Sequence, residues 1–224
     1  MTPTRFRGLA ALALASTVLM TGCNAVPDFN PGVAARVADD TITLNTVDDV
    51  STSYCEYVET QLQEGQVLAQ HLLRGQVAGS LALRSAADQF AREQGVTADP
   101  SYDVAAKRAE ESLGDLDPDQ VQAVIDVQGA NTYVQAVEQS VGAEMGTPGG
   151  TKAEIAAGQK AFEEWLADND IQIDPRFGIS IESGTTAPAD TSVSFPLGET
   201  ATKANADQPD TDYAGALPDT QRCG

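Results

Sequence analysis

Few side chains in this chain of 224 residues have the types and spacing that catalysis requires. The sequence contains one histidine, His71, and a Ser-His-Asp or Cys-His arrangement would have to use it. No GxSxG elbow or other nucleophile motif supports that role. No Cys/His cluster has the spacing of a zinc site, and no glycine-rich phosphate loop occurs. We therefore expect no catalytic residue, no metal and no cofactor, and a function in binding.

An acidic stretch in the middle of the chain has part of the spacing of a calcium loop. Asp115 and Asp126 are eleven residues apart, as the first and last ligands of such a loop are. The glycine that the loop requires is replaced by Gln120. A helix start is the better interpretation, because Asp117 is a capping residue, Pro118 suits the first helical position, and acids favour the positive end of the helix dipole.

The N-terminus has the pattern of an export signal. Arg5 and Arg7 precede an apolar run over residues 9–20, which is too short for a membrane-spanning helix. The residues LMTGC that follow resemble a bacterial lipobox, and this resemblance implies that Cys23 becomes the lipidated first residue. An ordinary secretory signal cleaved nearby is the alternative. A lipid on Cys23 would anchor the protein to the extracytoplasmic face of the cell membrane.

The two other cysteines suggest a crosslink. Disulfides persist outside the cytoplasm, and with Cys23 lipidated, Cys55 and Cys223 most simply pair with each other. Their bridge would close a loop of about 168 residues, which the chain-entropy estimate makes worth on the order of 4–5 kcal/mol. Free or intermolecular thiols are the alternative.

Charge excludes some partners. The 13 basic and 33 acidic residues give a net charge of −20, and removal of a leader with Arg5 and Arg7 brings it to −22. Nucleic-acid binders need a basic surface, so we expect no nucleic-acid partner. The same charge argues against an electrostatic attachment to anionic lipid, so membrane attachment would depend on the lipid at Cys23.

The mature chain opens with a hairpin and a helix. Apolar residues alternate from position 35 to position 44 around Asp39 and Asp40, which predicts a short β-hairpin with its turn at these two acids. Asn45 or Thr46 then offers a helix cap, with Asp48 and Asp49 in the first turn. Helical periodicity predicts four further helices, over residues 66–94, 102–113, 118–142 and 151–168.

The predicted fold is mainly α, with one small sheet. Ile171 and Ile173 alternate after five helices, and Pro175 ends that strand because proline cannot donate to a ladder. We expect this strand to return to the hairpin. The domains are a signal peptide over residues 1–22, a tether over 23–32, a helical domain over 33–181 and a mostly irregular tail over 182–224. Within the tail, Val193, Phe195 and Leu197 could form one short docked strand.

The order of these segments resembles the N-terminal chaperone domain of SurA-type foldases, a family that includes parvulin-type extracytoplasmic prolyl isomerases. The opening strands over residues 37–44 resemble the family's first strand. The family closes this domain with a turn that matches five residues here: Asp174, Pro175, Arg176, Phe177 and Gly178. The chain departs from the family because residues 95–150 are too few and too helical to hold a parvulin domain. No isomerase residues can therefore be carried over.

The resemblance implies a chaperone-like scaffold in which apolar helices surround a crevice. Its partners would be unfolded or extended exported proteins, bound by a holdase without isomerase chemistry. Alternatives are a module dedicated to one protein of the cell envelope, and a peptidyl-prolyl isomerase. The candidate crevice residues all belong to one predicted helix, and the alternative is that they are core residues. They are Leu72, Leu73, Val77, Leu81 and Phe90.

Overall fold

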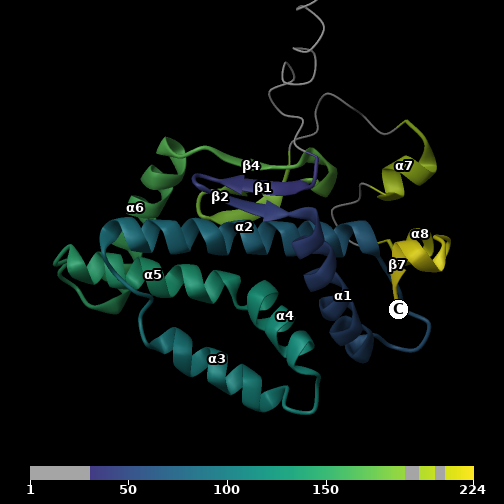
Figure 1. Cartoon of the computed structure of the whole chain (residues 1–224), viewed down its shortest axis with the longest axis horizontal. Coiled ribbons are helices and arrows are strands. Elements are labelled where there is room, and N and C mark those ends of the chain that lie inside the picture. Colours follow the sequence, from purple (N-terminus) through teal and green to yellow (C-terminus); the bar gives the residue numbers. More distant parts are fainter. Residues whose placement is uncertain (1–30, 190–196, 205–209) are drawn as a thin grey trace, which may run out of the picture. The chain divides into compact units, whose positions relative to one another are not determined.

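The computed structural model describes residues 31–189, 197–204 and 210–224 (Figure 1). The export signal, Cys23, the tether as far as Asn30, and Val193 and Phe195 lie outside the described residues. By its contacts the chain divides into two units, Met1–Pro31 and Gly32–Gly224, and every described helix and strand belongs to the second.

Within the described residues, six helices precede the returning strand, where the sequence predicts five. They are α1 Leu44–Gln61, α2 Gln70–Gln94, α3 Ser101–Ser112, α4 Pro118–Gln128, α5 Ala130–Glu144 and α6 Thr151–Asp168. The single helix predicted over residues 118–142 is two helices, because the chain bends at Gly129. The N–H of Gly129 donates to the Ile125 carbonyl at 2.9 Å, and a Cβ at this position would collide with the same carbonyl. Glycine therefore permits a bend that another residue would oppose.

Two helix starts differ from the prediction. Thr43 caps α1, accepting the Thr46 N–H on its Oγ1 at 3.1 Å, so Asp48 and Asp49 lie beyond the first turn. Helix α2 begins at Gln70 rather than near position 66, because β3 (Leu68–Ala69) pairs with the C-terminal strand β7 (Arg222–Cys223). A short-range pattern does not show that distant pairing.

A three-stranded antiparallel sheet joins the two ends of the helical region. It contains β1 (Val33–Val37), β2 (Asp40–Thr43) and β4 (Ile171–Ile173) in the order β2-β1-β4, so the returning strand pairs with the hairpin as the sequence predicts. The hairpin turn lies at Ala38 and Asp39, one residue earlier than predicted. Buried Gln89 of α2 holds this turn: its amide donates to the Val37 carbonyl at 2.6 Å and accepts the Asp39 N–H at 3.2 Å.

The five-residue turn after β4 packs onto α2. It begins at Asp174, whose carboxylate accepts the Arg176 N–H at 3.0 Å, and ends at Gly178 in the left-handed region at φ +60°. Phe177 is buried, and its carbonyl oxygen would lie 2.5 Å from a Cβ placed at Gly75. Close approach of the turn therefore requires a glycine in the middle of α2.

The hairpin β5 (Ile179–Glu182) and β6 (Thr185–Pro188) follows this turn and covers the next part of α2. A Cβ at Gly79 would meet the side chains of Thr186 and Ile179 at 3.0 and 3.2 Å. Figure 1 shows α2 between the three-stranded sheet and helices α4 and α5, with α3 on the far side of those two helices. Helix α2 is therefore the central element of the fold.

The described parts of residues 182–224 contain more regular structure than the mostly irregular tail that we expected. Besides β6 they hold α7 (Glu199–Ala204), α8 (Thr211–Gly215), a 3-10 turn (Asp219–Gln221) and β7. Asp210 caps α8 by accepting the Tyr213 N–H at 2.7 Å, and Ala214 is buried. Polar composition hid these elements, because they have no large apolar face. Strand β6 pairs with β5, and the disulfide and the β3–β7 pairing hold the C-terminal end.

Candidate functional site

The predicted crevice on α2 is not an open surface. Leu73, Val77 and Phe90 are buried in two core clusters, and Leu72 and Leu81 are half-buried. The Phe90 ring centroid lies 5.2 Å from that of Phe162. The three buried positions are core, the alternative that the sequence left open, because helices cover α2 on one side and the sheet and hairpins cover it on the other.

An apolar pocket lies instead between α3 and the α4–α5 bend. Its volume is about 190 Å³. It is lined by Tyr102, Ala105, Ala106 and Ala109 of α3 and by Val124, Ile125, Gln128, Gly129 and Thr132 of α4 and α5. The pocket exists because α3 presents alanines here, and their methyl groups are too short to fill the space against α4.

Pocket size decides which ligands are plausible. Cofactor and drug-sized sites measure roughly 300–1,000 Å³, whereas an apolar cavity of about 150 Å³ accepts benzene. A volume of about 190 Å³ therefore suits one aromatic or branched aliphatic side chain. Gln128 and Thr132 are exposed, and they can supply hydrogen bonds to the backbone that carries such a side chain.

A polar network fixes the α3 side of the pocket. Arg84 of α2 donates from Nη1 to the Tyr102 hydroxyl at 2.6 Å, and its guanidinium carbon lies 5.3 Å from the Tyr102 ring centroid and 4.6 Å from that of Tyr133. The two tyrosine rings meet edge to face at 4.9 Å. Arg84 also lies 3.7 Å from the Asp126 carboxylate. Tyr102, the buried residue of α3, is thus tied to α2, α4 and α5.

The protonation states in this network are set by burial. Burial, followed by the hydrogen bond to Asp88, raises the pKa of Tyr133 well above its ordinary range, so this hydroxyl remains a neutral donor to Asp88. Burial raises the pKa of Asp126, and the Gln122 hydrogen bond and Arg84 partly oppose that rise. These satisfied contacts indicate a supporting role for the network rather than a reactive one.

Sequence reasoning did not identify this pocket. Its one local signal is the alanine pattern at positions 105, 106 and 109, which share a face of α3 with Tyr102. That pattern on its own is typical of helix packing. The space appears once α4 and α5 are placed against it.

The other candidate residues have structural contacts. His71 is exposed, with Nε2 3.2 Å from the Ala204 carbonyl and its ring edge-on to Tyr213 at 6.2 Å. Asp117 precedes α4 with Pro118 at its first turn, as predicted, although the Asp117 side chain makes no capping hydrogen bond. Asp126 lies within α4, accepts a hydrogen bond from Gln122 Nε2 at 2.9 Å and lies 3.7 Å from Arg84.

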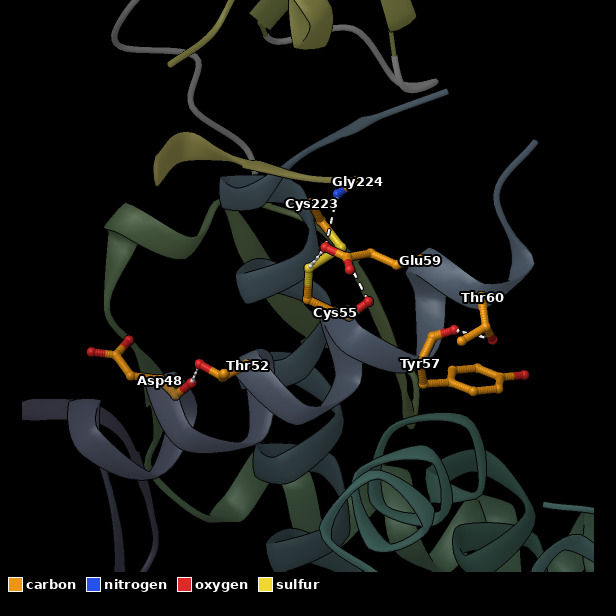
Figure 2. The surroundings of a disulfide bond; sticks show 8 residues. All are labelled: Asp48, Thr52, Cys55, Tyr57, Glu59, Thr60, Cys223 and Gly224. Atoms are coloured by element: carbon orange, nitrogen blue, oxygen red, sulfur yellow. Dashed lines mark hydrogen bonds between the residues drawn. A yellow bond between two sulfur atoms is a disulfide. The ribbon is translucent and has the colours of Figure 1, made fainter. Parts of the chain in front are cut away.

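Cys55 and Cys223 form the predicted disulfide, with their Cα atoms 5.7 Å apart. Figure 2 shows Glu59 beside the bridge, its Oε1 3.5 Å from the Cys55 sulfur and accepting the Gly224 N–H at 3.2 Å. Donor atoms of Cys55, Glu59 and Cys223 lie within 4.8 Å of one another, as metal ligands do. Because metal ligation requires thiolates, and both sulfurs are bonded to each other, the group is a crosslink here.

A search of protein-family models, curated proteins and solved structures found no match for this chain. The resemblance to SurA-type domains therefore stays a prediction. No helix in the part of the chain that the structure describes is long and apolar enough to cross a membrane.

Proposed function

We propose that this protein is a lipid-anchored, extracytoplasmic polypeptide-binding protein of the holdase type. Its α3–α5 pocket would receive one apolar side chain of an unfolded or extended segment of an exported protein. The observation that carries the proposal is the pocket of about 190 Å³ with a lining of small apolar residues. The export signal with Cys23, and the SurA-like order of strands, helices and closing turn, support the same proposal from the sequence.

The geometry favours weak and broad binding. A single small pocket contacts one side chain, and burial of a Leu or Phe side chain contributes roughly 1.5–3 kcal/mol before ordering costs. Shallow apolar sites of this kind accept many segments, which is what a holdase requires.

The experiment measures aggregation of a reduced, denatured model protein, followed by light scattering with and without the purified protein. We expect suppression to increase with the amount of protein and to require a molar excess, because a single apolar contact binds weakly. Ala106→Leu would place a side chain in the pocket and reduce suppression several-fold, because the site is then filled from within.

Ala156→Leu on α6 is the matched control, since Ala156 is exposed and outside the pocket. Equal suppression by both variants would show that the pocket is not the binding site. A wild-type protein that suppresses no aggregation would favour the alternative, a module for one envelope partner, and crosslinking in native membranes would then identify that partner.

Membrane attachment has its own test. Cys23→Ser should move the protein from the detergent phase to the aqueous phase of a detergent partition, because the residue that would carry the lipid is gone. The mass of the N-terminal peptide checks the cause. An unmodified peptide beginning at another residue would support the ordinary secretory signal instead.

A further inference from the structure

Two sulfurs and a carboxylate meet at the last two turns of α1. Cys55 and Glu59 lie four residues apart on one face of this helix, and strand β7 brings Cys223 beside them. The two sulfurs and one Glu59 oxygen all lie within 4.8 Å of one another. The sequence alone does not show this cluster, because Cys223 follows Cys55 by 168 residues.

The spacing of these donors fits a tetrahedral metal site. Zinc binds sulfur at about 2.3 Å and carboxylate oxygen at about 2.0–2.2 Å, so a tetrahedral sulfur–oxygen pair is separated by about 3.6 Å. Glu59 Oε1 lies 3.5 Å from the Cys55 sulfur. Two thiolates on one zinc ion are about 3.8 Å apart. The 5.7 Å between the two cysteine Cα atoms permits that separation once the disulfide is reduced.

Contacts other than the disulfide also hold Cys223 near α1. Leu68 of β3 pairs with Cys223, and the Gly224 N–H donates to Glu59 Oε1 at 3.2 Å (Figure 2). The Cys223 side chain is fully buried in a core cluster. We therefore expect the three donors to stay together when the bond between the sulfurs is broken.

We propose that the reduced protein binds one Zn²⁺ ion through the Cys55 and Cys223 thiolates and the Glu59 carboxylate, with water as the fourth ligand. Two thiolates favour zinc, whereas Ca²⁺ and Mg²⁺ require oxygen ligands. Zinc binding releases one proton from each thiol to the solvent. Glu59 is exposed and Cys55 is half-buried, so the ion and its water reach the site from the surface.

The reduced state occurs in the life of every chain. Both cysteines begin as thiols, because a disulfide forms only after synthesis and in an oxidising compartment. Zinc in this state connects α1 to β7 at the position where the disulfide connects them afterwards. The C-terminal end of the fold is therefore held in both redox states.

The test uses the full chain with Cys23→Ser, so that Cys55 and Cys223 are its only cysteines. Tris(2-carboxyethyl)phosphine reduces the disulfide: the two sulfurs gain two electrons and two protons, and the phosphine takes oxygen from water to become its oxide. The phosphine is then removed without air, and calorimetric titration with ZnCl₂ measures stoichiometry and affinity. We expect one ion per reduced chain at micromolar concentrations, with about two protons released, as buffers of different ionisation enthalpy report.

The oxidised protein is the matched control, because it carries the same carboxylates and lacks only the thiols. Zinc binding of equal affinity by the oxidised protein would assign the ion to surface acids and overturn the inference. Co²⁺ gives a second readout. We expect the strong visible absorption of tetrahedral Co²⁺ and the ultraviolet charge-transfer band of its thiolates in the reduced protein alone, and their absence would also overturn it.

Glu59→Gln tests the third ligand. Even groups that only hydrogen-bond to metal ligands change metal affinity by roughly 10–100-fold, so we expect the reduced variant to bind Zn²⁺ at least about tenfold more weakly. Glutamine can still accept the Gly224 N–H, so the fold should tolerate the change. Glu64→Gln is the control, since Glu64 is exposed, nearby and outside the cluster. Equal affinities of the two variants would overturn the assignment of Glu59.

Urea denaturation of the reduced protein, followed by circular dichroism, covers the case in which reduction weakens the fold. Zinc binds the folded site, so it should raise the urea midpoint of the reduced protein and leave that of the oxidised protein unchanged. If the reduced protein is unfolded, ZnCl₂ should restore its helical signal. A reduced protein that stays unfolded with zinc, or that is folded and gains no stability from zinc, would overturn the inference.

Discussion

Glu138 is a buried acid, and buried acidic side chains are rare. Its residue is 7% exposed on α5, and its Oε1 and the Phe162 ring both lie within 4 Å of where a Cβ would stand at Gly184. Burial, and then the charge of Glu163, raises the pKa of Glu138 to about 7. This carboxyl is therefore protonated in the folded protein at mildly acidic pH. At higher pH it ionises, and the buried charge then destabilises the folded state.

Glu138→Gln tests this cost. The pKa of this carboxyl rises from 4.5 to about 7 on folding. The folded protein therefore becomes less stable as pH increases between these two values, because the unfolded chain releases the proton at lower pH. Glutamine has the same shape and does not ionise. We expect the variant to be more stable by about 1–3 kcal/mol at pH 8 and nearly equal to wild type at pH 4.5. Urea denaturation at both pH values measures the difference.

Glu144→Gln on the same helix is the control, since Glu144 is exposed. It should change the free energy of unfolding by less than about 0.5 kcal/mol at either pH. A Glu138→Gln effect that is the same at pH 4.5 and pH 8 would contradict the assignment of the cost to ionisation.

Some roles of single residues could be predicted from the sequence, and others could not. The closing turn from Asp174 to Gly178 and the Cys55–Cys223 pair are present as predicted, because each depends on local chemistry or on simple pairing. The roles of Gln89 and Arg84 could not be foreseen, because their partners lie on elements far away in the sequence.

At the scale of elements, α5 and α6 pack with their backbones in contact. Gly142 of α5 lies against the backbone of Glu154, and Gly158 of α6 lies against the backbone of Glu138. A Cβ at either glycine would overlap the opposing carbonyl. The pairing of the two helices therefore depends on the absence of a side chain at two positions.

Gly158→Ala should destabilise the protein, although alanine is the better helix former. Helix propensity alone predicts a gain of roughly 1 kcal/mol. The collision with the Glu138 backbone cannot be relieved by moving a side chain, so we expect a net loss of at least about 2 kcal/mol. Gln159→Ala is the neighbouring control, since Gln159 is exposed and its change should be nearly neutral. A more stable Gly158→Ala variant in urea denaturation would show that α5 and α6 are not this close.

At the scale of the whole molecule, the disulfide connects α1 to the last strand, across 168 residues. Cys223 is fully buried in the cluster that includes Val47 and Tyr54, so the bridge also fills core space. Its closure constrains nearly the entire helical domain in the unfolded chain. It therefore stabilises the fold as a whole more than any one element.

Reduction should lower the free energy of unfolding by on the order of 4–5 kcal/mol, because the unfolded chain regains the entropy of an open loop. Urea denaturation with and without dithiothreitol measures the change. The double variant Cys55→Ser and Cys223→Ser should match the reduced protein and be insensitive to dithiothreitol. Wild-type stability that does not respond to dithiothreitol, with two thiols titrating in the native protein, would show that the bridge does not form.

Periodicity and capping residues in the sequence were sufficient to predict a mainly helical chain, the extent of α6, the end of α2 at Gly95 and the strand at Ile171–Ile173. These features depend on neighbours within one or two turns, and such contacts leave regular patterns. The expected pairing of that strand with the hairpin also holds, since both have one apolar face to cover.

Tertiary packing decided which apolar faces are covered and which are left open. Periodicity marks Leu73, Val77 and Phe90 as apolar, but core and binding surface have the same pattern, and only the placement of helices and sheet around α2 makes them core. The pocket beside α3 arises for the same reason. The alanines at positions 105, 106 and 109 leave a space beside α4. The space remains because Tyr102, bound to Arg84 of α2, keeps α3 from moving closer to α4.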